Sequence, residues 1–206
     1  MSSNFNSSQE EFWAGKFGAE YIFRNNDETL LNSNIELFSD IFSNIENIPV
    51  TFLELGANIG MNIKAIQKLI PKAEFTGIEI NHEACLLLAQ TGCEVVETSI
   101  MNANIVKKFD FVFSKTVLIH LPPEQLIPTY RKMYDYTNRF ILIAEYYNPT
   151  PVEVTYRGNA DKLFKRDFAG EFLDLFPDVT LKNYGFVYHR DPKPQDDINW
   201  FLLEKS

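Results

Sequence analysis

The segment FLELGANIG, residues 52–60, combines a carboxylate with two glycines at a spacing that can hold a ligand. Asn58 stands between Gly56 and Gly60, where the turn of a dinucleotide site requires another glycine. An asparagine side chain would crowd a pyrophosphate there, although asparagine tolerates the left-handed backbone of a tight turn. Glu54 precedes Gly56 by two residues, and its charge repels a diphosphate and attracts a cation. The segment therefore favours S-adenosylmethionine, which carries an ammonium and a sulfonium, over a dinucleotide.

Positions after the next strands are expected to complete the cofactor site. Glu79 follows Gly56 at about the separation at which an acidic residue reaches ribose hydroxyls, although it could instead cap the following helix. Ser99 and Ile100 follow the third strand, where an adenine can rest on an apolar side chain and meet a polar edge. The predicted cofactor residues also include Ile80 and Lys115.

The histidine in SKTVLIHLPP, His120, follows the fourth predicted strand, where a transferred methyl group would lie. An imidazole can take a proton near neutral pH, which suits it to deprotonating a hydroxyl acceptor. A structural hydrogen bond to backbone at the start of the next helix is an equal alternative. Tyr146, at the end of the fifth strand, and His189, in the last pair of strands, are the other catalytic candidates. For His189 a structural role is the favoured interpretation.

Residues 148–167 are expected to form a long loop that serves as a lid, because long loops in compact domains are usually functional. In the part of this segment from 157 to 167, basic residues outnumber acidic ones by four to two, in a chain that is acidic as a whole. This excess favours an anionic acceptor, although ion pairs in a solvated loop would give the same composition. The residues predicted to bind the acceptor are Glu145, Tyr147, Asn148, Arg157, Lys165 and Arg166.

These residues require a scaffold that brings strand ends to one edge. After Pro49, short continuous apolar runs alternate with helical segments, as in a parallel sheet covered on both faces. The alternation predicts a Rossmann-like, doubly wound α/β fold with seven mostly parallel strands. The last two strands are separated by RDPKPQDD and no helix, which predicts an antiparallel pair at one edge. We expect a single domain, 1–206, with a helical cap at 9–47 and a core at 48–206.

The composition of the 206-residue chain excludes several classes of function. A net charge of −9 without a basic tract argues against nucleic acid as the partner. Cys85 and Cys93 are too few for a disulfide framework, and no cluster of carboxylates and histidines suggests a metal. The first residues lack a leader pattern and the apolar runs are too short to span a bilayer, so a cytoplasmic protein is expected. The oligomeric state stays open.

The segments ELGANIG, GIEIN and FDFVFSKTVLIHLPP resemble motifs of class I S-adenosylmethionine-dependent methyltransferases. Over nearly the whole chain, EEFWAGKFGAEYIFRN, ILIAEYYNPTPVEVTYRG, KLFKRDFAGE and YGFVYHRDP are similar to the pseudaminic acid biosynthesis-associated methylase family. Asn58 departs from the general pattern at its middle glycine and fits this subgroup. The resemblance implies S-adenosylmethionine as cofactor and pseudaminic acid or a related nonulosonate, free or nucleotide-linked, as acceptor. Arg157 or Arg166 would bind its carboxylate.

The N-terminal segment is expected to complete the cofactor pocket. Trp13, Phe17, Tyr21 and Arg24 recur at spacings that can place them along one helical face, with Arg24 near the carboxylate of the cofactor. Packing against the sheet explains the aromatic residues as well. Tyr21 and Arg24 are therefore the predicted cofactor ligands from this segment.

The leading hypothesis is an enzyme that methylates an oxygen or nitrogen of an anionic sugar destined for surface glycans. A methyltransferase for another small metabolite would be favoured if the basic residues of the lid pointed away from the site. A dinucleotide-dependent enzyme on the same fold is opposed by Glu54 and Asn58. A non-catalytic cofactor-binding component of a pathway is compatible with the same residues.

Overall fold

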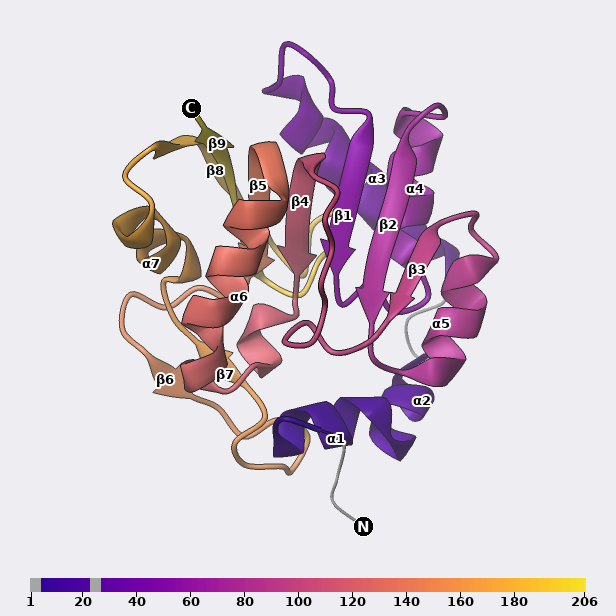
Figure 1. Ribbon diagram of the computed structural model, residues 1–206, viewed down its shortest axis with the longest axis vertical. Helices are drawn as coiled ribbons and strands as arrows, with labels where there is room; N and C mark the ends of the chain where they lie inside the picture. Colours follow the sequence, from indigo (N-terminus) through magenta and orange to yellow (C-terminus); the bar gives the residue numbers. More distant parts are fainter. Residues whose placement is uncertain (1–4, 23–26) are drawn as a thin grey trace.

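The computed structural model describes residues 5–22 and 27–206, and its centre is a seven-stranded sheet (Figure 1). The strand order is β3-β2-β1-β4-β5-β9-β8, with the first five strands parallel and β9 antiparallel to both β5 and β8. The predicted mostly parallel, seven-stranded sheet with an antiparallel edge pair is confirmed. The strands are β1 (Thr51–Leu55), β2 (Glu74–Glu79), β3 (Glu94–Glu97), β4 (Phe109–Lys115), β5 (Thr137–Glu145), β8 (Val179–Val187) and β9 (Ile198–Lys205).

Helices cover both faces of this sheet. Helices α3 and α4 contribute apolar side chains to a core on one face, and α6 and α7 do so on the other. Within β5, Leu142 belongs to the first core, whereas Ile141 and Ile143 belong to the second. Alternate residues of a strand point to opposite faces, which is why the buried strands are continuously apolar. The helices are α1 (Ser8–Ala14), α2 (Lys16–Ile22), α3 (Glu28–Ser43), α4 (Met61–Leu69), α5 (His82–Ala89), α6 (Pro123–Tyr136) and α7 (Phe168–Leu175), with a 3₁₀ turn at Leu118–His120.

The segment expected to form a helical cap divides into two parts with different positions. Helices α1 and α2 lie below the carboxyl ends of the central strands, where they can close a site (Figure 1). Helix α3 instead packs on the sheet beside α4, because Phe38, Ile41 and Phe42 are buried in the core on that face. The cap is therefore smaller than predicted. Arg24, one of its predicted ligands, lies outside the described residues.

Residues 148–167 contain regular structure where a loop was predicted. They contain two short strands, β6 (Val152–Glu153) and β7 (Phe164–Lys165), which pair antiparallel. Two contacts connect this segment to α1: the Gln9 amide donates to the Asp161 carbonyl at 2.9 Å, and the Lys162 ammonium donates to the Ser8 hydroxyl at 3.0 Å. The segment therefore meets the N-terminal cap beside the strand ends.

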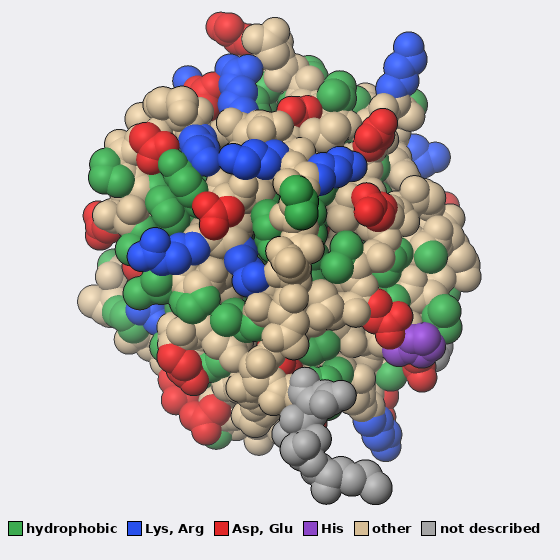
Figure 2. Space-filling model, in the orientation of Figure 1, with side chains coloured by type: hydrophobic (Ala, Val, Ile, Leu, Met, Phe, Trp, Pro, Cys, Tyr) green, Lys and Arg blue, Asp and Glu red, His purple; other side chains and the backbone are tan. Residues whose placement is uncertain are grey.

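The visible surface carries acidic and basic side chains side by side, with a short band of basic ones above its middle (Figure 2). Charged side chains pair in the described part of the chain, as in the contact of 2.7 Å between Lys182 and Glu204. Within residues 5–22 and 27–206, no helix has the length and apolarity needed to cross a membrane. The same residues hold no group of three or more metal-binding side chains.

Candidate functional site

A cavity of about 400 Å³ lies at the carboxyl edge of the sheet. Its wall includes the segment after β3, the tip of β2, the turn after β1, the end of β4 and the connection between β8 and β9. The first four of these segments adjoin β3, β2, β1 and β4, which are neighbours in the sheet, so the cavity extends along the edge formed by their carboxyl ends. The predicted site residues that line it are Tyr21, Gly56, Asn58, Glu79, Ile80, Ser99, Ile100, Lys115, His120 and His189.

The turn after β1 has a backbone that only a few residue types adopt readily. Gly56, Asn58 and Gly60 have φ angles of 68°, 46° and 76°, so the predicted left-handed geometry of Asn58 is confirmed. A Cβ at Gly56 would lie 2.6 Å from a methyl group of Val117, which leaves no space for a larger residue. Gly60 is the N-cap of α4 and does not line the cavity. Its role is in shaping the turn.

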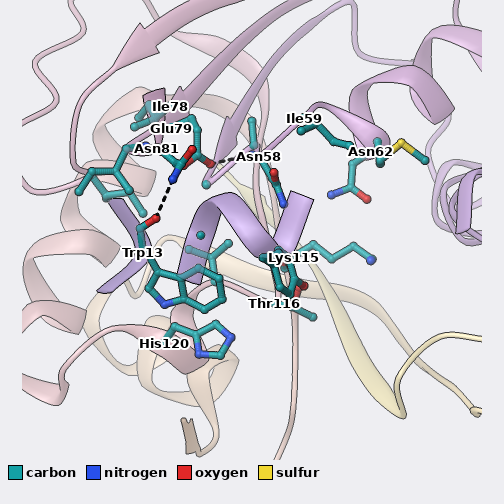
Figure 3. Close-up of a pocket in the computed structure, with 18 of the residues that line it drawn as sticks. Trp13, Asn58, Ile59, Asn62, Ile78, Glu79, Asn81, Lys115, Thr116 and His120 are labelled. Atoms are coloured by element: carbon teal, nitrogen blue, oxygen red, sulfur yellow. Dashed lines mark hydrogen bonds between the residues drawn. The ribbon is translucent and has the colours of Figure 1, made fainter. Parts of the chain in front are cut away.

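Glu79 accepts three hydrogen bonds from backbone amides and faces the cavity (Figure 3). Its carboxylate accepts from Asn58 at 2.7 Å and from Ile80 and Asn81 at 2.8 Å each. Burial raises the pKa of Glu79, and the three amides oppose this shift. Helix α5 is capped by Asn81 instead, whose side chain accepts from Ala84 at 3.1 Å. Glu79 therefore connects the glycine turn to the tip of β2.

The segment after β3 forms the more apolar end of the cavity. Ser99 and Ile100 are both buried and line it together with Met101. The amide of Asn6 donates to the Ser99 hydroxyl at 3.2 Å, and Asn81 donates to the carbonyl of Trp13 at 3.2 Å. These contacts hold the N-terminal cap over this end of the cavity.

Glu54 lies behind the cavity and does not line it. The side chain is only 1% exposed, and one of its oxygens accepts from the Asn62 amide at 2.6 Å. Burial raises the pKa of Glu54 to about 8, while the Asn62 hydrogen bond and the Lys115 charge lower it. The predicted direct contact between this carboxylate and a cationic ligand is therefore not supported. Asn62, on the first turn of α4, forms this part of the wall instead.

His120 is 7% exposed and faces both this cavity and a second one. Its Nδ1 lies 2.6 Å from the carbonyl oxygen of Lys162. A carbonyl only accepts, so Nδ1 carries the proton and the neutral ring keeps its lone pair on Nε2. Burial lowers the pKa of His120 to about 4. The expected backbone hydrogen bond exists, but its partner is the segment between β6 and β7, not a helix start.

Aromatic rings enclose His120. Its ring centroid lies 4.7 Å from that of Trp13 and 4.9 Å from that of Tyr156. Trp13 also contacts Tyr21 edge to face, at 5.3 Å. Figure 3 shows Trp13 and His120 next to each other, while the extended Lys115 side chain lies on the side of the view where Asn62 is found. The imidazole is therefore packed among aromatic rings on this side.

The second cavity has a volume of about 400 Å³ and adjoins the first. Its wall contains Tyr146, Tyr156 and Arg157, which do not line the first cavity. The residues common to both walls are Tyr21, Leu30, Thr116, His120, Pro194 and Asp196. His120 thus stands at the boundary between two ligand-sized spaces.

Glu145 was expected to contact the acceptor, but it is buried and lines neither cavity. Its carboxylate accepts from the Ser114 hydroxyl at 2.7 Å and from the amides of Val117 and Leu118 at 3.1 and 3.0 Å. Burial raises the pKa of Glu145 to about 7, against the effect of these donors. Glu145 therefore stabilises the turn that carries His120, and the structure does not support a role in binding the acceptor.

Four other predicted acceptor ligands also lie away from both cavities: Tyr147, Asn148, Lys165 and Arg166. Arg166 pairs with Glu171 at 2.6 Å, and the Lys165 ammonium lies 5.1 Å from the centre of the Tyr146 ring. These basic groups are thus occupied by neighbouring side chains. Of the predicted basic ligands, Arg157 is the one that the structure places on the second cavity.

The remaining catalytic candidates have different surroundings. His189 lines the first cavity, but its half-exposed ring lies 2.9 Å from the Asp197 carboxylate. Tyr146 lines the second cavity, and burial raises the pKa of its hydroxyl. His120 alone of these three faces both cavities.

In the connection between β8 and β9, sequence reasoning identified His189 but missed Gln195 and Asp196. Gln195 is buried and its amide donates to the Asn34 side chain at 2.9 Å, across a separation that no local pattern reveals. Asp196, the next residue, lines both cavities. The only signal was the polar, proline-containing composition of RDPKPQDD. Asn62 and Tyr156 were missed for the same reason, because packing alone brings them to the site.

No protein-family profile and no curated sequence matches this chain. Among solved structures, magnesium protoporphyrin IX methyltransferase (ChlM) from Synechocystis PCC 6803 with bound SAM has a TM-score of 0.71 at 11% identity, covering 99% of this chain and 100% of that chain. The plantazolicin methyltransferase BpumL with SAH has a TM-score of 0.66 at 15% identity, over 97% and 94%. The glycopeptide N-methyltransferase MtfA with SAM has a TM-score of 0.66 at 11% identity, over 85% and 94%. The chain therefore has the Rossmann-like fold of these S-adenosylmethionine-dependent methyltransferases.

Proposed function

We propose that this chain is an S-adenosylmethionine-dependent methyltransferase that acts on a small acceptor. The observation that carries the proposal is the boundary position of His120 between two adjoining cavities, one of them lined by most of the predicted cofactor residues. A cofactor on one side and an acceptor on the other would meet at this histidine. The fold supports the proposal, because its structural neighbours are methyltransferases crystallised with SAM or SAH.

The first cavity fits the chemistry of the cofactor. The Glu79 carboxylate, oriented by three amides, can accept hydrogen bonds from both ribose hydroxyls. Ile100 offers an apolar surface to the adenine, and Ser99 lies beside it. Asn58 faces the cavity where a pyrophosphate would need space, which disfavours a dinucleotide. When bound, S-adenosylmethionine supplies an activated methyl group on a sulfonium.

The residues around His120 would position the acceptor and exclude water. Methyl transfer is an in-line displacement, so alignment supplies much of the acceleration. With its pKa near 4, His120 is neutral at pH 7 and a weaker base than an ordinary imidazole, and its free Nε2 can accept a hydrogen bond from the acceptor and then its proton as the methyl group is transferred. Trp13 and Tyr156 pack against the His120 ring and Tyr21 packs against Trp13, so these rings would help to exclude water from the transfer point.

A narrower proposal concerns an anionic sugar acceptor, a nonulosonate of the pseudaminic acid type or its nucleotide-linked form. Arg157 supports it, because its guanidinium lines the second cavity and can bind a carboxylate. The sequence resemblance to the pseudaminic acid-associated methylases supports the same acceptor.

A second candidate is a neutral or cationic small metabolite. Lys165 and Arg166 are engaged outside the cavities, while Asp27 and Asp196 line the second cavity beside three tyrosines. Carboxylates and aromatic faces attract an amine more strongly than a carboxylate. This arrangement favours an acceptor amine over an acid.

Calorimetric titration with S-adenosylhomocysteine, beside a nicotinamide dinucleotide, tests the cofactor. We expect binding of the first compound alone; binding of the dinucleotide alone would overturn the proposal. A cofactor labelled on its methyl group, incubated with nonulosonates, their nucleotide-linked forms and small amines, then separates the two acceptor classes. If the cofactor binds but no label is transferred in a single turnover to either class of acceptor, the chain is a non-catalytic binding component.

A further inference from the structure

The end of the first cavity nearest β4 and β9 contains a cation that has no ion-pair partner among the described residues. Lys115, the last residue of β4, is the only lysine or arginine that the described residues contribute to this wall. Its side-chain ammonium makes no ion pair or hydrogen bond with any residue in 5–22 or 27–206. Burial lowers the pKa of Lys115, and the charges of Glu54, Asp196 and Glu145 oppose that shift. An enclosed ammonium that faces a cavity is a binding group for an anion.

A free carboxylate lies at the same end. Asp196 belongs to the connection between β8 and β9, is exposed, and makes no hydrogen bond or ion pair within the described part of the chain. Its position is defined by Gln195, which is buried and bound to Asn34 on α3. Lys115 and Asp196 therefore present opposite charges to one end of one cavity.

The order of the strands decides which part of a cofactor would lie there. Ser99 and Ile100 follow β3, Glu79 ends β2, and Lys115 ends β4, on the other side of β1. The strands β3 and β4 are three positions apart, which corresponds to roughly 14 Å across the sheet. With adenine at β3 and ribose at β2, the amino-acid group of the cofactor would extend to β4.

We propose that Lys115 and Asp196 form a clamp for the zwitterionic amino-acid group of the cofactor, Lys115 binding its carboxylate and Asp196 its ammonium. This inference rests on the proposed function and specifies the part of the cofactor that each residue recognises. It assigns to the connection between β8 and β9 a role in cofactor affinity. The same connection contributes Asp196 to the second cavity, so the clamp would also link cofactor binding to the acceptor side.

Three ligands test the clamp by calorimetry on the full chain: S-adenosylhomocysteine, its decarboxylated analogue, and 5′-methylthioadenosine, which lacks the whole amino-acid group. Lys115→Met should lower the affinity for S-adenosylhomocysteine about 10- to 100-fold and leave the other two unchanged. Asp196→Asn should weaken both ligands that keep the amino group, by about 10-fold or more, and leave 5′-methylthioadenosine unchanged. Retained binding of 5′-methylthioadenosine shows that each variant is folded.

Lys193→Met and Asp191→Asn are matched controls, because both residues are exposed in the same connection and line neither cavity. They should change none of the three affinities. Equal losses for all three ligands, or no loss for S-adenosylhomocysteine, would overturn the clamp while leaving the proposed function intact. Failure of the wild-type chain to bind S-adenosylhomocysteine would overturn both. If Lys115→Met does not fold, the exposed Asp196→Asn decides the question.

Discussion

The two adjoining cavities are built in different ways. The cofactor side depends on short connected segments: the Glu79 carboxylate joins the tip of β2 to the turn at 56–60 through the Asn58 amide, and two amides that follow Glu79 orient it. The proposed acceptor side collects single side chains from segments that are far apart in sequence, among them Tyr21, His120, Tyr156 and Arg157. Backbone interactions therefore define one side, and side-chain packing defines the other.

This difference has a functional consequence. A site made from turns and strand ends keeps its shape when neighbouring side chains vary, so it suits an invariant cofactor. A site made from side chains on a cap and a segment such as 148–167 can change specificity by substitution without altering the sheet. The substitutions below are expected to affect the two sides separately.

Replacing His120 should have the largest effect and should affect only the acceptor side. His120→Asn can keep a donor near the Lys162 carbonyl but loses the free Nε2. We expect turnover to fall about 10²- to 10⁴-fold, as for loss of a general base, while the S-adenosylhomocysteine affinity stays within about twofold. Single-turnover kinetics with the acceptor found by screening measure the first quantity, and calorimetry the second.

His189→Asn is the matched control, because His189 lines the cofactor cavity but bonds to Asp197. It should retain most of the turnover. Normal turnover in His120→Asn would place the base elsewhere or show that none is needed.

Acidic pH should lower the stability of the fold by protonating His120, on the acceptor side. The pKa of His120 is about 4 in the folded chain and about 6.5 when unfolded, so its neutral form is favoured by folding. This contribution to the free energy of unfolding is present above pH 6.5 and is lost as the pH falls towards 4. The loss amounts to roughly 3 kcal/mol at most. Urea unfolding at pH 7 and pH 4.5 should show a smaller difference for His120→Asn than for the wild type.

The buried carboxyl of Glu54, behind the cofactor cavity, should respond in the opposite sense. Burial raises the pKa of Glu54 to about 8 in the folded chain. The free-energy cost of ionising this carboxyl in the folded state therefore grows as the pH rises above the pKa that it has in the unfolded chain. Glu54→Gln should therefore remove part of the loss of stability between pH 5 and pH 8. Equal pH profiles for wild type and both variants would contradict these assignments.

Glu79→Gln should weaken the cofactor side alone. The amide nitrogen of the new glutamine cannot accept a hydrogen bond. The variant therefore loses the hydrogen bonds that one carboxylate oxygen of Glu79 accepts from Asn58, Ile80 or Asn81, and it loses a partner for the ribose. The affinity for S-adenosylhomocysteine should fall about 10- to 100-fold in calorimetry. Glu83→Gln, an exposed change on the first turn of α5, is the control and should bind normally.

The smallest expected effect concerns the backbone of the glycine turn. Asn58 has a φ of 46°, so Asn58→Ala should cost about 1 kcal/mol and Asn58→Gly close to nothing. For a chain of this size, 1 kcal/mol corresponds to a shift of Tm of about 2–4 °C. A thermal shift assay compares the two variants, and equal Tm values would mean that the left-handed turn does not constrain this position.

Local patterns in the sequence determined the sheet, its antiparallel edge pair and the left-handed turn at Asn58. Strand periodicity and glycine geometry are properties of neighbouring residues, so they can be recognised without coordinates. Glu79, Ser99 and Ile100 could be predicted as cofactor-side residues because strand ends of a parallel sheet meet at one edge.

Only the tertiary structure decided which polar side chains face a cavity and which are occupied elsewhere. Glu145 and Arg166 stand at promising places in the sequence, yet one caps the turn of His120 and the other pairs with Glu171. Asp196 reaches both cavities because Gln195 binds Asn34 across the fold. The physical reason is that the direction of a side chain at a strand end depends on packing between segments that are distant in the chain, and no local periodicity encodes that packing.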